Sequence, residues 1–168
     1  ETVVVFLPGA GGDVTQVDNL SPYVPPKPEQ WARLVGGRVG AEAVKVLLSA
    51  EPGSEVPLDH TSRVLEFKRR VPRPERVKAC LEMVQKNPQE VGHTEWTFAK
   101  EIVLLDAKLA KEPTVKAEVQ VIQVGPVVLI SNPAEYFCQF GLDIKAASPF
   151  PITFPVMLAN GCVGYVPT

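Results

Sequence analysis

Segments with strand-like and helix-like patterns alternate along this 168-residue chain, and that alternation constrains its fold more than any other feature. Runs of β-branched residues and loose two-residue alternation predict strands, whereas apolar residues at steps of three and four predict helices. The predicted strands are Thr2–Leu7, His60–Arg70, Thr114–Val124, Pro126–Ile130 and Ile152–Leu158. The predicted helices are Glu29–Ala50, Pro74–Lys86, Thr94–Ala110 and Pro133–Ala147. This order predicts an α/β fold, or a mixed α+β fold, with a central sheet flanked by helices.

Three local features add detail to this fold. The continuous apolar run Thr2–Leu7 predicts a strand that is buried on both faces. Gly125 separates two predicted strands and predicts a tight hairpin between them. Three glycines interrupt the first predicted helix, where each weakens a helix by roughly 1 kcal/mol relative to alanine. We therefore expect close packing at these positions, which are Gly36, Gly37 and Gly40.

Length and charge limit the class of protein. The length suits one domain or part of one, so residues 1–168 are interpreted as a single partial domain with a proline-rich connector at 20–28. With 17 Lys and Arg against 19 Asp and Glu, the net charge is −2, which argues against nucleic acid as a partner. No apolar run reaches the roughly 18 residues that a transmembrane helix needs. Three cysteines are too few for a disulfide framework and leave the compartment open.

The first segment that could carry chemistry is a glycine-rich turn, Gly9–Asp13, directly after a predicted strand. The backbone N–H groups of such a turn can hold an anion or an oxyanion. Asp13 and Thr15 would then lie at the rim of the site. The glycine spacing matches neither a phosphate-binding P-loop nor a dinucleotide fingerprint. The alternative is an ordinary turn in which the Asp13 carboxylate accepts a hydrogen bond from a nearby backbone N–H.

Two further candidates lie in the last third of the chain. Glu135 follows a strand and Pro133, where a carboxylate either stabilises the first turn of a helix or faces a cleft as a metal ligand. Tyr165 is flanked by small residues that leave space around its hydroxyl, although such tyrosines usually serve packing. His60 and His93 have no second ligand at helical spacing and are interpreted as ordinary surface or capping residues.

Together and in this order, these segments resemble the neutral/alkaline non-lysosomal ceramidase family. The sequence Gly12-Asp13-Val14-Thr15-Gln16 is similar to the family's Gly-Asp-Val-Ser-Pro-Asn loop. Pro133-Ala134-Glu135-Tyr136 resembles its Pro-(Ala/Gly)-Glu-(Phe/Tyr) segment. Ala159-Asn160 and Tyr165-Val166-Pro167-Thr168 resemble its Ala-Asn-x-x-x-x-Tyr-Val-x-Thr segment. The resemblance spans the chain and corresponds to the second half of the family's catalytic domain.

The resemblance implies a hydrolase that cleaves the amide of N-acyl sphingosine, or of a related N-acyl lipid or amine, with one catalytic zinc. It implies that Glu135 and Tyr165 bind the zinc and that Thr15, in the loop with Gly12 and Asp13, replaces the family's serine. The family's two zinc histidines would lie upstream of Glu1, so this chain should need the upstream half of the same protein for activity. The family's proteins imply a secreted or periplasmic location.

Two other functions remain open at this point. One is a non-catalytic binding or structural module that retains the fold. The other is an unrelated α/β domain whose glycine loop binds a phosphorylated small molecule. The enzyme hypothesis makes a geometric prediction. If the strands Pro126–Ile130 and Ile152–Leu158 are parallel neighbours, Glu135 and Tyr165 converge beyond one sheet edge, and the loop Gly9–Thr15 borders the same site.

Overall fold

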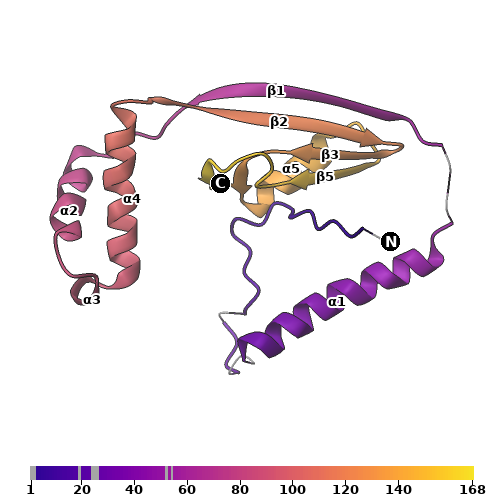
Figure 1. Ribbon diagram of the computed structural model, residues 1–168, viewed down its shortest axis with the longest axis horizontal. Helices are drawn as coiled ribbons and strands as arrows, with labels where there is room; N and C mark the ends of the chain where they lie inside the picture. The colour runs from indigo at the N-terminus through magenta and orange to yellow at the C-terminus, as the bar shows by residue number, and fades with distance from the viewer. Residues whose placement is uncertain (1–2, 19, 24–26, 52, 54) are drawn as a thin grey trace. The chain divides into compact units, whose positions relative to one another are not determined.

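The computed structural model describes residues 3–18, 20–23, 27–51, 53 and 55–168. The chain forms two compact units, one from residues 1–62 with 120–168 and the other from residues 63–119 (Figure 1). The second unit is therefore an insertion between two halves of the first. The predicted connector at 20–28 includes residues 24–26, which lie outside the described residues.

A four-stranded sheet joins segments that are distant in the sequence. Its strands are β1 (Leu58–Lys68), β2 (Thr114–Val124), β3 (Val127–Ser131) and β5 (Ile152–Val156), in the order β1-β2-β3-β5. β2 and β3 form the predicted antiparallel hairpin, in which Gly125 turns the chain with φ +58°. β3 and β5 are parallel, with Val128 opposite Thr153. The mixed α+β fold with this largely antiparallel sheet confirms the predicted fold class.

The helices of the inserted unit enclose a small core. They are α2 (Pro74–Val84), the short α3 (Pro88–Val91) and α4 (His93–Leu109). Pro74 begins α2, as expected for a proline without an N–H to satisfy. α2 packs against α4. The core of this unit consists of Val77, Cys80, Ala99 and Ile102.

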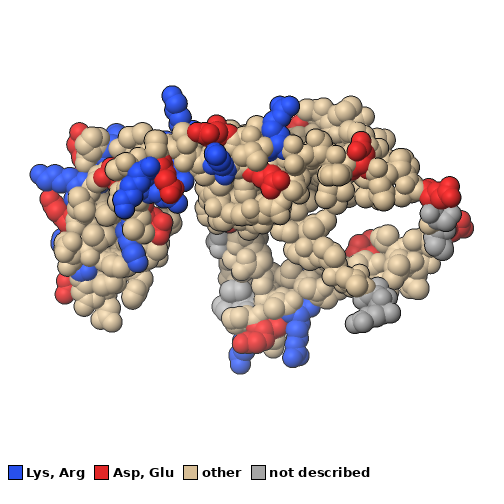
Figure 2. Space-filling model, turned by 45° about the horizontal axis from the view of Figure 1, so that its top comes forward, with Lys and Arg blue, Asp and Glu red and all other residues tan. Residues whose placement is uncertain are grey.

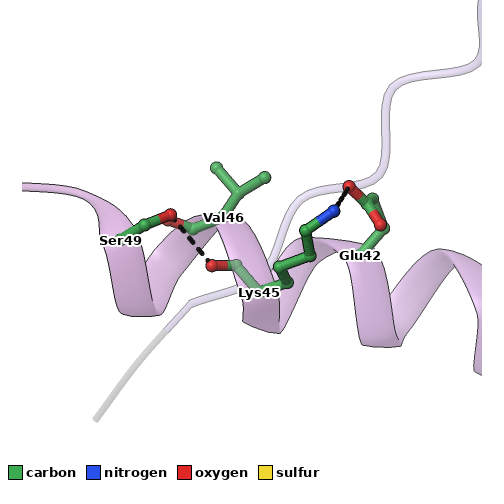
Figure 3. Close-up of polar contacts among 4 residues, drawn as sticks. All are labelled: Glu42, Lys45, Val46 and Ser49. Atoms are coloured by element: carbon green, nitrogen blue, oxygen red, sulfur yellow. Dashed lines mark hydrogen bonds and ion pairs between the residues drawn. The ribbon is translucent and has the colours of Figure 1, made fainter.

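The helix α1 (Pro28–Ser49) has the predicted extent but a different environment. None of its residues is buried, and apart from the adjacent backbone of the helix itself no described atom lies within 4 Å of a Cβ built on Gly36, Gly37 or Gly40. The expected close packing at these glycines is therefore wrong. Local contacts stabilise the end of α1 (Figure 3). Ser49 Oγ donates to the backbone carbonyls of Lys45 and Val46. The Lys45 ammonium forms an ion pair with the Glu42 carboxylate at 3.0 Å.

The apolar run at the N-terminus does not form the predicted buried strand. Residues 3–9 adopt no regular structure, and Val4 and Phe6 are 88% and 77% exposed. This segment meets β5 where Met157 N donates to Pro8 O at 2.9 Å. Because Pro8 and Pro155 both lack an N–H, they interrupt any ladder that these two segments could form.

A second, two-stranded sheet changes the interpretation of the segment around Glu135. β4 (Ala134–Tyr136) and β6 (Gly164–Val166) pair in parallel, and α5 (Cys138–Ala147) begins only after β4. The predicted helix Pro133–Ala147 therefore starts five residues too early, and Glu135 lies in a strand and not in a first helical turn.

No described helix is both long and apolar enough to cross a membrane.

Candidate functional site

Glu135 and Tyr165 lie side by side on the two neighbouring strands of the smaller sheet. They are register partners in the parallel pair β4–β6. Each strand follows one of the parallel strands β3 and β5, so the predicted parallel arrangement brings both side chains to the same end of the main sheet. The predicted convergence of these two residues is confirmed.

The buried residue Asn132 sets the path of the chain into β4. It is 4% exposed, and its Oδ1 accepts the N–H of Ala134 at 2.8 Å. Its own N–H and its Nδ2 donate to the Val156 carbonyl at 2.9 and 3.3 Å. Asn132 therefore ties the end of β5 to the beginning of β4. Sequence reasoning overlooked this role, although the Asn-Pro dipeptide is a known turn signal.

A tight loop places Tyr165. Between β5 and β6 the backbone is left-handed at Leu158 (φ +56°) and Asn160 (φ +60°), and Gly164 has φ +90°. Val163 N donates to the carbonyl of Pro133 at 2.9 Å, which fastens this loop to the turn before β4. The small residues around Tyr165 therefore serve a compact turn, and the Tyr165 side chain remains 64% exposed.

The glycine loop lies directly against the backbone of Glu135. Gly12 N donates to Tyr136 O at 2.8 Å, and a Cβ built on Gly12 would lie 2.5 Å from Glu135 O. Only glycine fits this backbone approach. The contact supports the prediction that this loop borders the site, but the Gly12 N–H donates to Tyr136 O and is not free to bind an oxyanion in this conformation.

Asp13 and Thr15 make contacts of different kinds. Asp13 Oδ1 accepts the N–H of Cys138, the first residue of α5, at 2.6 Å. Asp13 therefore caps α5 from a distant loop. Thr15 is exposed, and its Oγ1 accepts the N–H of Val17 at 3.4 Å in a local turn. The assignment of Thr15 to the site stays a prediction.

The environment of Tyr165 stabilises the protonated phenol. A hydrogen bond with the Glu135 carboxylate, and then the negative charge of that carboxylate, raise the pKa of Tyr165 above its ordinary value of 10.0. Cys162 contributes a smaller electrostatic effect in the same direction. The folded chain therefore holds this proton more tightly than the unfolded chain. The resulting stabilisation is complete below pH 10 and is lost as the pH rises through the folded pKa.

This linkage predicts the alkaline titration of Tyr165. The ultraviolet tyrosinate band of the wild type, minus that of Tyr165→Phe, isolates this residue from Tyr136, whose pKa is also raised, by burial. We expect a midpoint above 10 that falls toward 10 in Glu135→Gln. An unchanged midpoint in Glu135→Gln would show that the two side chains do not interact.

The other candidate groups do not join this pair. His60 is exposed on β1, and His93 is exposed as the first residue of α4. Among the described residues, no group of three or more His, Cys, Asp or Glu is arranged to hold a metal ion.

Beside the glycine loop, an apolar cavity of about 470 Å³ opens between Leu7, Cys138 and Phe154, and Glu135 is not among its lining residues.

Comparison with known proteins adds no relative. No protein-family model, curated protein or solved structure matches this chain.

Proposed function

We propose that this chain is part of a zinc-dependent hydrolase that cleaves the amide bond of an N-acyl lipid or another N-acyl amine. The pairing of Glu135 with Tyr165 is the observation that carries the proposal. Two oxygen-bearing side chains from different parts of the sequence meet there, and one of them, Tyr165, remains exposed to solvent. The ceramidase-like motifs in the sequence point to the same two residues.

The chemistry of the pair fits zinc as a partial ligand set. Zinc accepts carboxylate oxygen, and the Tyr165 oxygen is close enough to the Glu135 carboxylate to share a hydrogen bond with it. Catalytic zinc sites use three protein ligands and an open position. The remaining ligands would be the histidines that the resemblance places in an upstream segment. When bound, zinc with an open position lowers the pKa of its water to about 7 and polarises a carbonyl.

The chain's own residues would position the substrate around this pair. The contact of Gly12 with Tyr136 holds the glycine loop beside Glu135, and Asp13 fixes the same loop to α5. Thr15 would offer an exposed hydroxyl to orient or attack the scissile carbonyl. Its β-methyl group restricts the hydroxyl to fewer rotamers than serine would have.

The proposal predicts a contrast between the isolated chain and a longer product of the same gene. The 168 residues alone should bind zinc weakly and hydrolyse no amide, because they supply two ligands. The chain extended through the coding sequence upstream of Glu1 should bind zinc tightly and cleave at least one member of an N-acyl amine panel. Zinc titration by calorimetry and product detection on both proteins test this. Tight zinc binding by the isolated chain would place the ligands elsewhere.

A non-catalytic binding or structural module is the second candidate. It is favoured by the engagement of Gly12 N–H and Asp13 in contacts that hold the fold together. In that case the extended protein would be inert on every N-acyl amine, with or without zinc.

A further inference from the structure

Positive charge is concentrated in one of the two compact units. Residues 63–119 carry twelve Lys and Arg against nine Asp and Glu, whereas the rest of the chain carries five against ten. Figure 2 shows Lys and Arg side chains gathered over this helical unit, at the left of the view. The net charge of −2 for the whole chain conceals this separation.

Two segments of the unit form what we call the basic cluster. Arg69 joins them, since its backbone N–H donates to Pro113 O and its Nε donates to Glu112 O, both at 2.9 Å. The Glu112 carboxylate lies 3.5 Å from Arg69 and 3.9 Å from Lys108. These contacts place the residue after β1 next to the segment that follows α4, and α2 packs against α4. The basic cluster comprises Lys68, Arg69, Arg70, Arg73, Arg76, Lys108 and Lys111.

Most of the positive charge of the cluster is exposed. Arg70, Arg73 and Arg76 are exposed, and within the described part of the chain they have no ion pair. Glu112 is shared between two cations and neutralises only part of their charge. Free arginines on a surface of this kind attract a multivalent anionic partner.

Exposed apolar residues lie next to these arginines in the sequence. Val71, between Arg70 and Arg73, is 75% exposed, and Phe67 is 50% exposed. Val71 lies in the Val-Pro-Arg-Pro segment that leads into α2, next to the buried Pro72. Basic residues with exposed apolar residues among them are typical of surfaces that rest on a lipid interface.

We propose that the basic cluster docks the protein on a bilayer that contains anionic phospholipid. Four to eight Lys and Arg in one patch are enough for such binding, and each contributes a factor of roughly five in affinity. Nucleic acid fits less well, because DNA- and RNA-binding domains are strongly basic overall, and this chain has an isoelectric point near 5.8. Exposed Val71 also gains contact in a bilayer and none along a phosphate backbone. The basic cluster belongs to the inserted unit and the Glu135–Tyr165 pair to the other unit, and the proposal does not depend on the proposed hydrolase activity.

Co-sedimentation with vesicles tests the proposal. The whole chain should bind vesicles of phosphatidylcholine with phosphatidylserine, bind pure phosphatidylcholine vesicles far more weakly, and lose affinity as salt is raised. The triple variant R70E/R73E/R76E should bind the anionic vesicles at least about 100-fold more weakly. Val71→Ser should reduce binding several-fold without changing its salt dependence.

A matched control separates the location of charge from its amount. The variant R33E/R38E/K45E on α1 changes the net charge equally and should bind as the wild type does. Circular dichroism shows whether the charge-reversed variant folds. If it does not fold, the milder variant R70Q/R73Q/R76Q, which removes the positive charges without reversing them, takes its place. Equal binding to neutral vesicles, equal losses in both triple variants, or binding to a DNA or RNA oligonucleotide but not to vesicles would each overturn the proposal.

Discussion

Replacing Gly12 with alanine is expected to lower the free energy of unfolding by about 3 kcal/mol. The new Cβ would lie 2.5 Å from the carbonyl oxygen of Glu135 and 3.1 Å from that of Tyr136, both of them backbone atoms that cannot rotate away. Overpacking of this kind costs typically 1–3 kcal/mol, and displacement of the loop also removes the hydrogen bond from Gly12 to Tyr136, worth roughly 1 kcal/mol. Urea denaturation followed by circular dichroism measures the loss.

The matched control for this variant is Gly36→Ala. Apart from the adjacent backbone of α1 itself, no described atom lies within 4 Å of the added Cβ at Gly36, and alanine favours a helix over glycine by roughly 0.5–1 kcal/mol. The same substitution should therefore destabilise at Gly12 and stabilise at Gly36. If Gly12→Ala left stability unchanged, the loop would not lie against Glu135, and its place in the proposed site would be lost.

The sequence predicted those parts of the fold that local patterns determine. The hairpin around Gly125 carries its own turn residue, and each of its strands is long enough to show a pattern. The helices α2 and α4 of the inserted unit were predicted because their apolar residues repeat at helical spacing, whereas the four-residue α3 is too short to show a repeat. The convergence of Glu135 and Tyr165 followed from the rule that parallel strands end at one sheet edge, once β3 and β5 were neighbours.

The remaining features depend on contacts between distant segments. β4 and β6 are three residues long, too short for any periodicity, and they exist only because they pair with each other. The apolar pattern of Val3–Leu7 suits a strand, but Pro8 and Pro155 interrupt pairing with its neighbour. The cap that Asp13 provides to α5 joins residues 125 positions apart in the sequence. No local pattern contains such a contact.

The position of Glu135 in β4 makes it the most sensitive residue of the proposed hydrolase. In the protein extended upstream of Glu1, Glu135→Ala should weaken zinc binding by more than about 100-fold, since even residues that only support a ligand contribute 10–100-fold. Hydrolysis of any N-acyl amine that the extended protein cleaves should fall to background. Glu42→Ala removes an exposed carboxylate from α1 and is the control, which should keep both zinc and activity.

Measuring zinc content and activity together distinguishes the roles that Glu135 could have. Loss of both identifies it as a ligand, because Tyr165 alone does not replace the carboxylate that holds the metal. Loss of activity with full zinc content would instead assign Glu135 to proton transfer, and the metal would be held by other residues. If the variant retained both, the pair Glu135–Tyr165 would be a structural contact of the two-stranded sheet, and the non-catalytic module would be the better description of this chain.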